Sequence, residues 1–220
     1  DIPELGRNMA RIRDHENVTN YDQWKKAVQG YLASISFVDD CLGRVLDAVE
    51  NSRYADNTTI VLWSDHGWHL GEKLHWRKFA LWEEATHNAL MFSGAGVPRS
   101  GMRCHAPVGL IDIYPTLIDV CGLEPRSELE GISLRPLLEN PKAERDRPAL
   151  TTWRRNNHSL RTRHWRYTRY ADGSEELYDH RQDPLEWKNL ADNPQYESIK
   201  KNVEKWFPIA NAPYSPKDQH

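Results

Sequence analysis

The sequence predicts an α/β fold in layers, followed by a small antiparallel sheet and a C-terminal helix. Three observations support this prediction. Apolar residues recur at helical spacing between residues 28 and 49, a continuous apolar, β-branched run follows at 58–64, and four short strand-like runs lie beyond residue 148. We therefore expect a main α/β unit at residues 1–145 and a small α+β unit at residues 146–220.

The composition indicates a folded protein and gives no sign of a nucleic-acid or membrane partner. The chain has 220 residues, 39% of them hydrophobic, with 9 Trp and 9 Tyr, whereas disordered chains are poor in aromatic residues. The 29 Lys and Arg against 32 Asp and Glu leave a net charge of −3, which indicates neither a nucleic-acid nor a membrane partner. No apolar run approaches the roughly 20 residues that cross a bilayer.

The first 50 residues predict an irregular lead-in and one long helix. Residues 1–20 show no apolar period, and beyond them apolar residues three or four positions apart fall on one helix face. Asn20 is the expected N-cap, with Gln23 three residues on, and Asn51 is expected to end the helix. The apolar face consists of Val28, Tyr31, Leu32, Ile35, Val38, Leu42, Val45, Leu46 and Val49.

The next segments predict a layered α/β arrangement. The run at 58–64 is continuously apolar, which is typical of a central parallel strand covered on both faces. Gly122 lies just beyond a predicted helix and is expected to end it. The elements predicted here are a short helix at 79–87, strands at 88–92 and 105–110, and a helix at 113–120.

The composition changes near residue 140, where prolines and charged residues at 141–148 predict a connection. An Asp-Gly pair within 171–174 is a turn signal between two strands. Residues 194–206 are expected to form a closing helix that completes the small antiparallel unit. The strands expected in this unit lie at 149–153, 158–163, 165–170 and 175–178.

The first candidate site is the sequence Ser-Asp-His-Gly at 64–67, directly after the best predicted strand. In open α/β sheets, ligands gather beyond the carboxyl ends of the strands. Asp65 offers a carboxylate and His66 an imidazole, and both can bind a metal ion. Gly67 would permit a sharp turn. The alternative is a polar strand end followed by a turn, with no ligand.

The loop that follows is rich in groups that could act on a substrate. Residues 66–87 contain four of the ten histidines, among them His75 and His87. Ordering so polar a loop between two strands costs free energy, which favours a functional role. The alternative is a solvated surface loop, and for Lys73 and Glu83 we prefer that interpretation.

A second candidate surface is basic. The segment 147–171 contains seven arginines and no acidic residue, interleaved with Trp and Tyr. Such a pattern can bind nucleic acid, but the chain is acidic overall and carries no nucleic-acid motif. The alternatives are solvated arginines on the outer face of a sheet, and arginines that hold a sulfated or carboxylated sugar. In the latter case His158 is a candidate substrate contact.

Several motifs occur in the order in which one enzyme family has them. They include SDHGWHLGE at 64–72, HWRK at 75–78, WEEATH at 82–87, LIDIYPTL at 110–117 and ELYD at 176–179. In these motifs the chain resembles the type I sulfatases of the alkaline phosphatase superfamily, in particular the iduronate-2-sulfatase-like branch. The resemblance covers most of the chain, from about residue 28 to residue 195.

The resemblance implies an alkaline-phosphatase-like mixed sheet sandwiched by helices, of which this chain holds a part. It also implies a centre with one divalent cation, usually Ca²⁺. Asp65 and His66 match two ligands of that cation. Imidazole suits zinc and other transition metals better than calcium, so the metal identity stays open. Lys78 matches the lysine that contacts the sulfate group, where a cation offsets charge on the ester oxygen. His87 and His75 match positions on the substrate side.

The nucleophile of the family has no counterpart in the chain. Type I sulfatases use a formylglycine made from Cys or Ser in a Cys/Ser-x-Pro/Ala-x-Arg motif, which no cysteine or serine of this sequence fits. The family's first metal-binding aspartates also have no counterpart. We therefore interpret the chain as the C-terminal portion of a sulfatase and expect the formylglycine in a missing N-terminal half. The chain alone is expected to be inactive.

The reaction expected of the whole enzyme is hydrolysis of a sulfate ester, either of a sulfated carbohydrate or of another small molecule. One alternative is a phosphodiesterase or phosphonate monoester hydrolase of the same superfamily, in which Asp65 and His66 would suit zinc or manganese. Another is a non-catalytic half-domain that binds anions. No residue pattern fixes the compartment, and periplasmic, lysosomal and secreted locations all stay open.

Overall fold

The computed structural model describes residues 1–98 and 101–213. Two helices open the chain, α1 (Glu4–Met9) and α2 (Ile12–Asn20), so the prediction of an irregular lead-in is wrong. Helix α1 has no side-chain cap, and helices this short are marginal without tertiary contacts. Met9 supplies such a contact in a buried cluster with Leu81 and Tyr170. Because these partners are distant in the sequence, no local pattern indicates the helix.

The long helix α3 (Trp24–Glu50) confirms the helical period of the apolar residues. It begins after Gln23, whereas the predicted cap, Asn20, is the last residue of α2. Asn51 follows the last turn, as predicted, and its N–H donates to the carbonyl oxygen of Asp47. No helix among the described residues has the length and the apolar character needed to cross a bilayer.

Strand β1 (Thr59–Trp63) pairs with β4 (Leu90–Gly94) in antiparallel register, with Val61 opposite Phe92. The expectation of a central parallel strand is therefore wrong for the described residues. A continuous apolar run shows that both faces avoid water, but it does not set the direction of the partner strand. In the described part of the chain no third strand joins this pair, and β1 is half-buried instead of buried.

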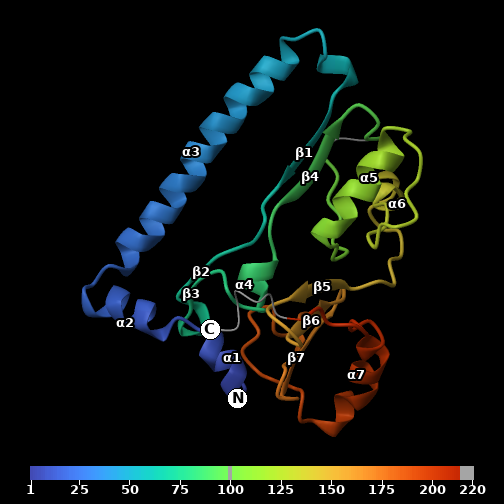
Figure 1. The fold of residues 1–220 in the computed structure, drawn as a ribbon. Helices are drawn as coiled ribbons and strands as arrows, with labels where there is room; N and C mark the ends of the chain where they lie inside the picture. The colour runs from blue at the N-terminus through green and yellow to red at the C-terminus, as the bar shows by residue number, and fades with distance from the viewer. Residues whose placement is uncertain (99–100, 214–220) are drawn as a thin grey trace.

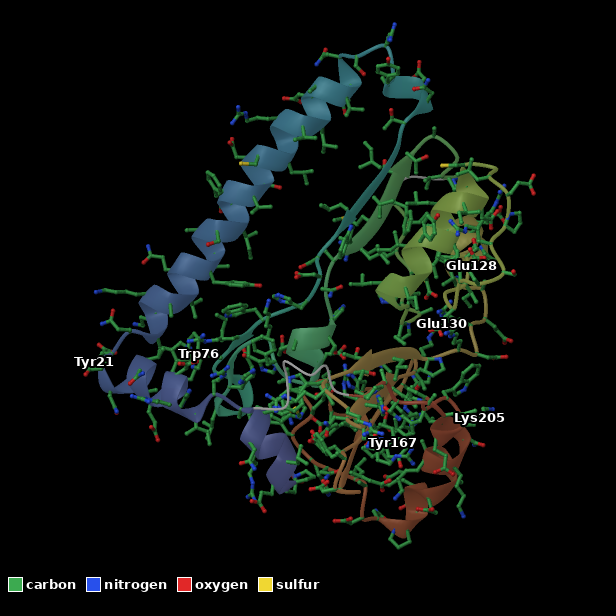
Figure 2. The ribbon with its side chains drawn as sticks, in the orientation of Figure 1. Tyr21, Trp76, Glu128, Glu130, Tyr167 and Lys205 are labelled. Carbon is green, nitrogen blue, oxygen red and sulfur yellow. The ribbon has the colours of Figure 1, made fainter. Side chains whose placement is uncertain are left out.

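The apolar face of α3 stays open to solvent. Figure 1 shows α3 standing beside β1 and β4, with a wide separation along most of its length. At its first residue, Trp24 packs edge-on against His15 and Trp76, close to the labelled Trp76 in Figure 2. No residue of α3 is buried, and Leu32, Val38 and Val45 are each more than half exposed. The sequence therefore predicts the helix correctly, and within the described residues its apolar face is not covered.

Helix α5 (Ile113–Val120) has the predicted bounds and lies on the side of β4 away from α3 (Figure 1). Gly122 follows it with a φ of +64°, as a glycine that ends a helix does. The prediction of a strand at 105–110 is wrong. This segment is irregular and leads into a 3₁₀ turn, because the carboxylate of Asp112 accepts the N–H groups of Gly109 and Ile132.

The remaining elements before the small sheet are short. They are 3₁₀ turns at Ala55–Asn57 and Glu72–Leu74, strands β2 (His69–Leu70) and β3 (Trp76–Arg77), and helices α4 (Glu83–Thr86) and α6 (Arg135–Glu139). Strands β2 and β3 form an antiparallel hairpin in the loop that follows β1. The predicted helix at 79–87 thus shortens to the single turn α4.

The small antiparallel sheet is confirmed, with its four strands in chain order. Gly173 turns the chain between the last two strands with a φ of +85°. The closing helix is a 3₁₀ turn at Pro194–Tyr196 followed by α7 (Glu197–Glu204). Val203 and Phe207 pack with Tyr167 in the largest buried cluster, where Figure 2 shows the side chains crowded together. The strands are β5 (Ala149–Thr152), β6 (His158–Arg161), β7 (Trp165–Arg169) and β8 (Glu175–Asp179).

Candidate functional site

Asp65 and His66 lie directly beyond the carboxyl end of β1, as the sequence predicts. Their side chains approach each other, with Nε2 of His66 3.4 Å from Oδ2 of Asp65. The Asp65 side chain is 69% exposed and that of His66 is 29% exposed. The pair therefore presents a carboxylate and an imidazole together at the surface.

The hydrogen bonding of His66 suits a metal ligand. Its Nδ1 lies 2.8 Å from the carbonyl oxygen of Gly67, and because a carbonyl only accepts, Nδ1 carries the proton. The lone pair of the neutral ring is then on Nε2, the nitrogen that faces Asp65. Metal-binding histidines commonly donate their second nitrogen to a backbone carbonyl in this way. The two residues fit a divalent cation as two of its ligands, and Ca²⁺ would need about four to six further oxygens.

Gly67 joins this strand end to α4. Its N–H donates to the carbonyl oxygen of Ala85 at 2.8 Å. A Cβ at position 67 would lie 2.0 Å from the carbonyl oxygen of Glu84, so a larger residue would displace the helix. The φ of Gly67 is not positive. Glycine is thus required by the close approach of α4, and the sharp turn expected from the sequence is not the reason.

Lys78 directly follows the hairpin of β2 and β3, which has a strained backbone. Lys73, Leu74 and Arg77 have φ values of +53°, +56° and +82°. The left-handed region costs such residues about 1–2 kcal/mol each, and strain of this kind concentrates at functional sites. Lys78 is half-buried, with Nζ 5.6 Å from the centroid of the Phe79 ring. Over residues 1–98 and 101–213, no carboxylate pairs with its ammonium.

Lys73 holds the hairpin against the small sheet, so its interpretation as a solvated surface residue is wrong. Its Nζ donates to the backbone carbonyl of Glu186 at 2.5 Å and to the hydroxyl of Tyr178 at 3.3 Å. The ammonium also lies 5.2 Å from the Trp82 ring and 4.7 Å from the Tyr178 ring. Burial lowers the pKa of this ammonium.

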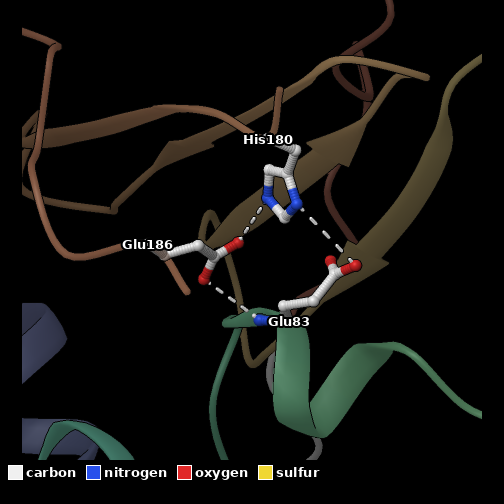
Figure 3. Close-up of side chains that lie close together, drawn as sticks. All are labelled: Glu83, His180 and Glu186. Carbon is white, nitrogen blue, oxygen red and sulfur yellow. Dashed lines mark hydrogen bonds and ion pairs between the residues drawn. The ribbon is translucent and has the colours of Figure 1, made fainter. Parts of the chain in front are cut away.

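A buried network of ions joins α4 to the small sheet. Arg166 of β7 is 1% exposed and binds the carboxylates of both Glu83 and Glu186. Nε of Arg161 lies 3.0 Å from Oε2 of Glu83. Figure 3 shows two further contacts of Glu186. Its Oε1 lies 2.9 Å from Nε2 of His180, and its Oε2 accepts the backbone N–H of Glu83 at 3.1 Å.

The cations of this network keep both carboxyl groups ionised. Burial alone would raise the pKa of Glu83, but Arg166 and Arg161 outweigh it and lower the pKa to about 2. Burial likewise opposes the charge of Glu186, and Arg166 with His180 lowers its pKa. Glu83 is therefore a structural anion, and its interpretation as a solvated residue is wrong.

The same cluster could in principle bind a metal ion, because ligand atoms of Glu83, His180 and Glu186 lie within 4.8 Å of one another. Two guanidinium groups already neutralise its carboxylates, which leaves little net charge for a cation. We therefore assign the cluster to holding α4 against the small sheet. Sequence reasoning missed it because its members come from three separate segments, and the arginine-rich run was the one signal.

The histidines of the loop separate into surface and interior positions. His87 is 77% exposed, with Nδ1 3.7 Å from Oε1 of Glu83. His75 is fully buried, its Nδ1 accepts the N–H of Arg11 at 2.8 Å, and its ring packs 4.8 Å from that of His69. Burial lowers the pKa of His69 and His75 to about 4, so both rings are neutral at pH 7. A substrate role for His87 or His75 stays a prediction.

His158 is the first residue of β6 in the small sheet. Its ring nitrogens are 2.8 Å from Oγ1 of Thr152 and 2.7 Å from Oδ1 of Asn211, and the residue is 4% exposed. Burial lowers its pKa. A substrate contact at His158 stays a prediction.

The arginine-rich segment divides among several environments. Arg154 and Arg155 are exposed, whereas Arg169 lies over the Phe207 ring at 4.3 Å. Arg166 is buried in the ion network. The interpretation of these arginines as a uniformly solvated outer face is therefore wrong for Arg166, because its carboxylate partners come from α4 and from the segment after β8.

Comparisons with known proteins give consistent matches. The family model described as sulfatase matches residues 8–123, and the model described as N-sulphoglucosamine sulphohydrolase, C-terminal, matches residues 71–209. A curated protein named sulfatase from Formosa agariphila is 44% identical over 215 residues, which are 96% of this chain and 42% of that protein. The chain thus spans less than half the length of that relative.

Two solved structures are similar in fold as well as in sequence. One was solved in complex with its substrate, D-glucosamine-2-N,6-O-disulfate; it is 27% identical, with a TM-score of 0.71 over 83% of this chain and 40% of that chain. The other is a phosphonate monoester hydrolase from Silicibacter pomeroyi, 26% identical, with a TM-score of 0.65 over 76% of this chain and 37% of that chain.

Proposed function

Because the chain belongs to the sulfatase family, we propose that it forms the part of a sulfate ester hydrolase that holds a metal and contacts the sulfate group. Its fold is alkaline-phosphatase-like, in agreement with the structures it resembles. The observation that carries the proposal is the Asp65–His66 pair beyond β1, in which Nε2 of His66 faces the carboxylate.

Four of the candidate residues have a role in this proposal. Asp65 and His66 would hold a divalent cation, for which we propose Ca²⁺, and the cation would supply positive charge that offsets the charge of the sulfate group. The ammonium of Lys78 binds the sulfate and stabilises the negative charge that builds on the ester oxygen as the S–O bond breaks. His87 is the exposed imidazole that can pass a proton to the leaving alcohol.

The rest of the catalytic centre would come from an N-terminal half outside this chain, including the formylglycine nucleophile. Three observations support that proposal. The chain spans 42% of its Formosa relative, the apolar face of α3 is exposed, and β1 is half-buried with one paired edge in the described residues. The isolated chain, with residues 1–145 in the main domain and 146–220 in the C-terminal subdomain, would then bind ligands without turning them over.

A sulfated sugar is the substrate class that the comparisons favour. One similar structure holds a disulfated glucosamine, and one matching family model is named for an enzyme of N-sulphated glucosamine. The motifs at 64–72 and 75–78 further favour the iduronate-2-sulfatase-like branch.

The test uses the full product of the gene that encodes this chain, assayed for sulfate released from D-glucosamine-2-N,6-O-disulfate. Lys78→Ala is expected to lower kcat/KM by about 10²–10³-fold. Asp65→Asn is expected to raise the Ca²⁺ concentration required for half-maximal activity. Asp172→Asn is the matched control, since Asp172 is an exposed turn carboxylate bonded to Ser174. Full activity in both site variants would contradict the proposal.

A phosphonate monoester hydrolase is the second candidate, because one similar solved structure has that activity by name. The same full-length protein would then cleave a phenylphosphonate ester faster than a sulfate ester, and zinc or manganese would support it better than calcium. If the gene encodes no nucleophile at all, a non-catalytic anion-binding role would replace both candidates.

A further inference from the structure

A basic pocket lies where the main unit meets the small sheet. Its volume is about 350 Å³, and it is formed by residues 106–107, the connection 143–148 and the turn 161–163. Four of its lining residues are arginines, against two acidic residues. Neither the metal pair nor Lys78 belongs to it, so the proposed function leaves this pocket without a role. The arginines are Arg145, Arg147, Arg161 and Arg163.

Arg145 is the fixed part of the pocket. Its side chain is 7% exposed, and its Nη2 donates to the carboxylate of Asp112 at 2.6 Å. That carboxylate is itself held by the N–H groups of Gly109 and Ile132. The Nε of Arg145 is buried and has no hydrogen-bond partner in residues 1–98 and 101–213. Because a buried donor without an acceptor is unfavourable, an oxygen atom from a ligand would stabilise this arginine.

Arg147 and Arg163 add charge that no carboxylate neutralises within the described ranges. Nη1 of Arg147 donates to the backbone carbonyl of Glu130 at 2.7 Å, and Arg163 is exposed. The acidic lining residues, Glu144 and Asp146, are also exposed, so their carboxylates can turn toward solvent. Guanidinium groups bind sulfate and carboxylate through paired N–H donors, so this set of side chains is suited to an oxyanion.

The pocket adjoins the candidate site through one arginine. Arg161 lines the pocket and also binds Glu83 at 3.0 Å. Glu83 in turn lies 3.7 Å from the exposed ring of His87. These two contacts connect the pocket, through Arg161 and Glu83, to the exposed ring of His87.

We propose that the pocket binds a second oxyanion group, a sulfate or a carboxylate, on the sugar whose sulfate ester reacts at the Asp65–His66 centre. The inference rests on the proposed function. A substrate with two anionic groups, such as the disulfated glucosamine bound in one similar structure, presents one group for cleavage and one that stays intact. The pocket would recognise the intact group and so select substrates that carry one.

The test is a binding titration of the ¹⁵N-labelled chain by NMR, which requires no turnover. D-Glucosamine-2-N,6-O-disulfate, inorganic sulfate and unsulfated D-glucosamine are added separately at constant ionic strength. The disulfate is expected to shift the Nε–Hε signal of Arg145 and the amides of Ala143 and Thr162. Arg147→Gln and Arg163→Gln should each weaken its binding by roughly tenfold or more. Arg155→Gln, an exposed arginine outside the pocket, is the control of equal charge and should bind as the parent chain does.

Three results would overturn the proposal. One is a titration that leaves the Arg145 signal unmoved, and another is an equal loss of affinity in the Arg155→Gln control. The third is equal affinity for inorganic sulfate and for the disulfated sugar, which would mean a site for a free anion. Because binding is read without activity, an inactive full-length protein that keeps this binding would contradict the sulfatase proposal and leave the pocket assignment standing.

Discussion

Replacing Arg166 by Met is expected to lower the free energy of unfolding by about 3–5 kcal/mol. Arg166 is 1% exposed and binds the carboxylates of both Glu83 and Glu186. Methionine keeps much of the apolar volume but removes both ion pairs. The two carboxylates then lose their shared guanidinium partner, and Arg161 beside Glu83 and His180 beside Glu186 remain. The magnitude is that of breaking a buried ion pair by removing one partner, which leaves the other charge uncompensated.

The assay is urea unfolding of the chain at pH 7, followed by tryptophan fluorescence, together with a thermal melt. In a chain of this length each kcal/mol shifts Tm by about 2–4 °C, so Arg166→Met should melt about 6–20 °C lower. Arg155→Met is the matched control, because it removes the same charge from an exposed side chain and should change stability by about 0.5 kcal/mol or less.

A double-mutant cycle separates the ion pair from a general packing defect. Glu186→Gln added to Arg166→Met should cost less than the two single changes together, by about 1–3 kcal/mol. The reasoning is refuted if Arg166→Met costs below about 1 kcal/mol, if it equals the Arg155→Met control, or if the two effects are additive. Any of these results would mean that the network contributes little to joining α4 and the small sheet.

Three further predictions concern the loop beyond β1. Between pH 7 and pH 4.5 the free energy of unfolding should fall by about 2 kcal/mol for each of His69 and His75. The pKa of each is about 4 in the folded chain and 6.5 in the unfolded chain, so the unfolded chain binds protons first as the pH falls. Urea midpoints at both pH values measure this, and a flat profile contradicts it. Gly67→Ala should cost about 1–3 kcal/mol in the same assay by displacing α4, whereas Gly43→Ala, which meets no neighbouring atom, should not destabilise. Lys73→Met should speed amide hydrogen exchange in the β2–β3 hairpin by about tenfold or more, and unchanged exchange by mass spectrometry would show that Lys73 does not hold it.

Local sequence pattern was sufficient to predict the elements that are determined by residues close together in the sequence. The period of apolar residues predicted α3, the strands of the small sheet followed from their alternation and turns, and α5 with Gly122 had its correct bounds. The Asp65–His66 pair was also found from sequence, because a polar pair directly after an apolar strand is a local feature. The likeness to known sulfatase motifs indicated Lys78 as a sulfate contact, and that role stays a prediction.

The antiparallel pairing of β1 with β4 required the tertiary structure. An apolar run states how strongly a strand avoids water, and the direction of its partner depends on the path of the chain between them. The same holds for α1, because Met9 packs in a buried cluster with Leu81 and Tyr170 from distant segments. Helix α3 shows the opposite: its apolar face is predicted by local pattern, but no described residue buries it.

Burial of charge was the property that sequence could not assign. Lys73 and Glu83 belong to a polar loop, and nothing in that loop distinguishes them from solvated neighbours. Only the fold brings Glu83 to Arg166 and places the Lys73 ammonium on the carbonyl of Glu186. A charge is stable inside a protein when an opposite charge or a hydrogen-bond acceptor meets it there, and in this chain those partners arrive from segments far along the sequence.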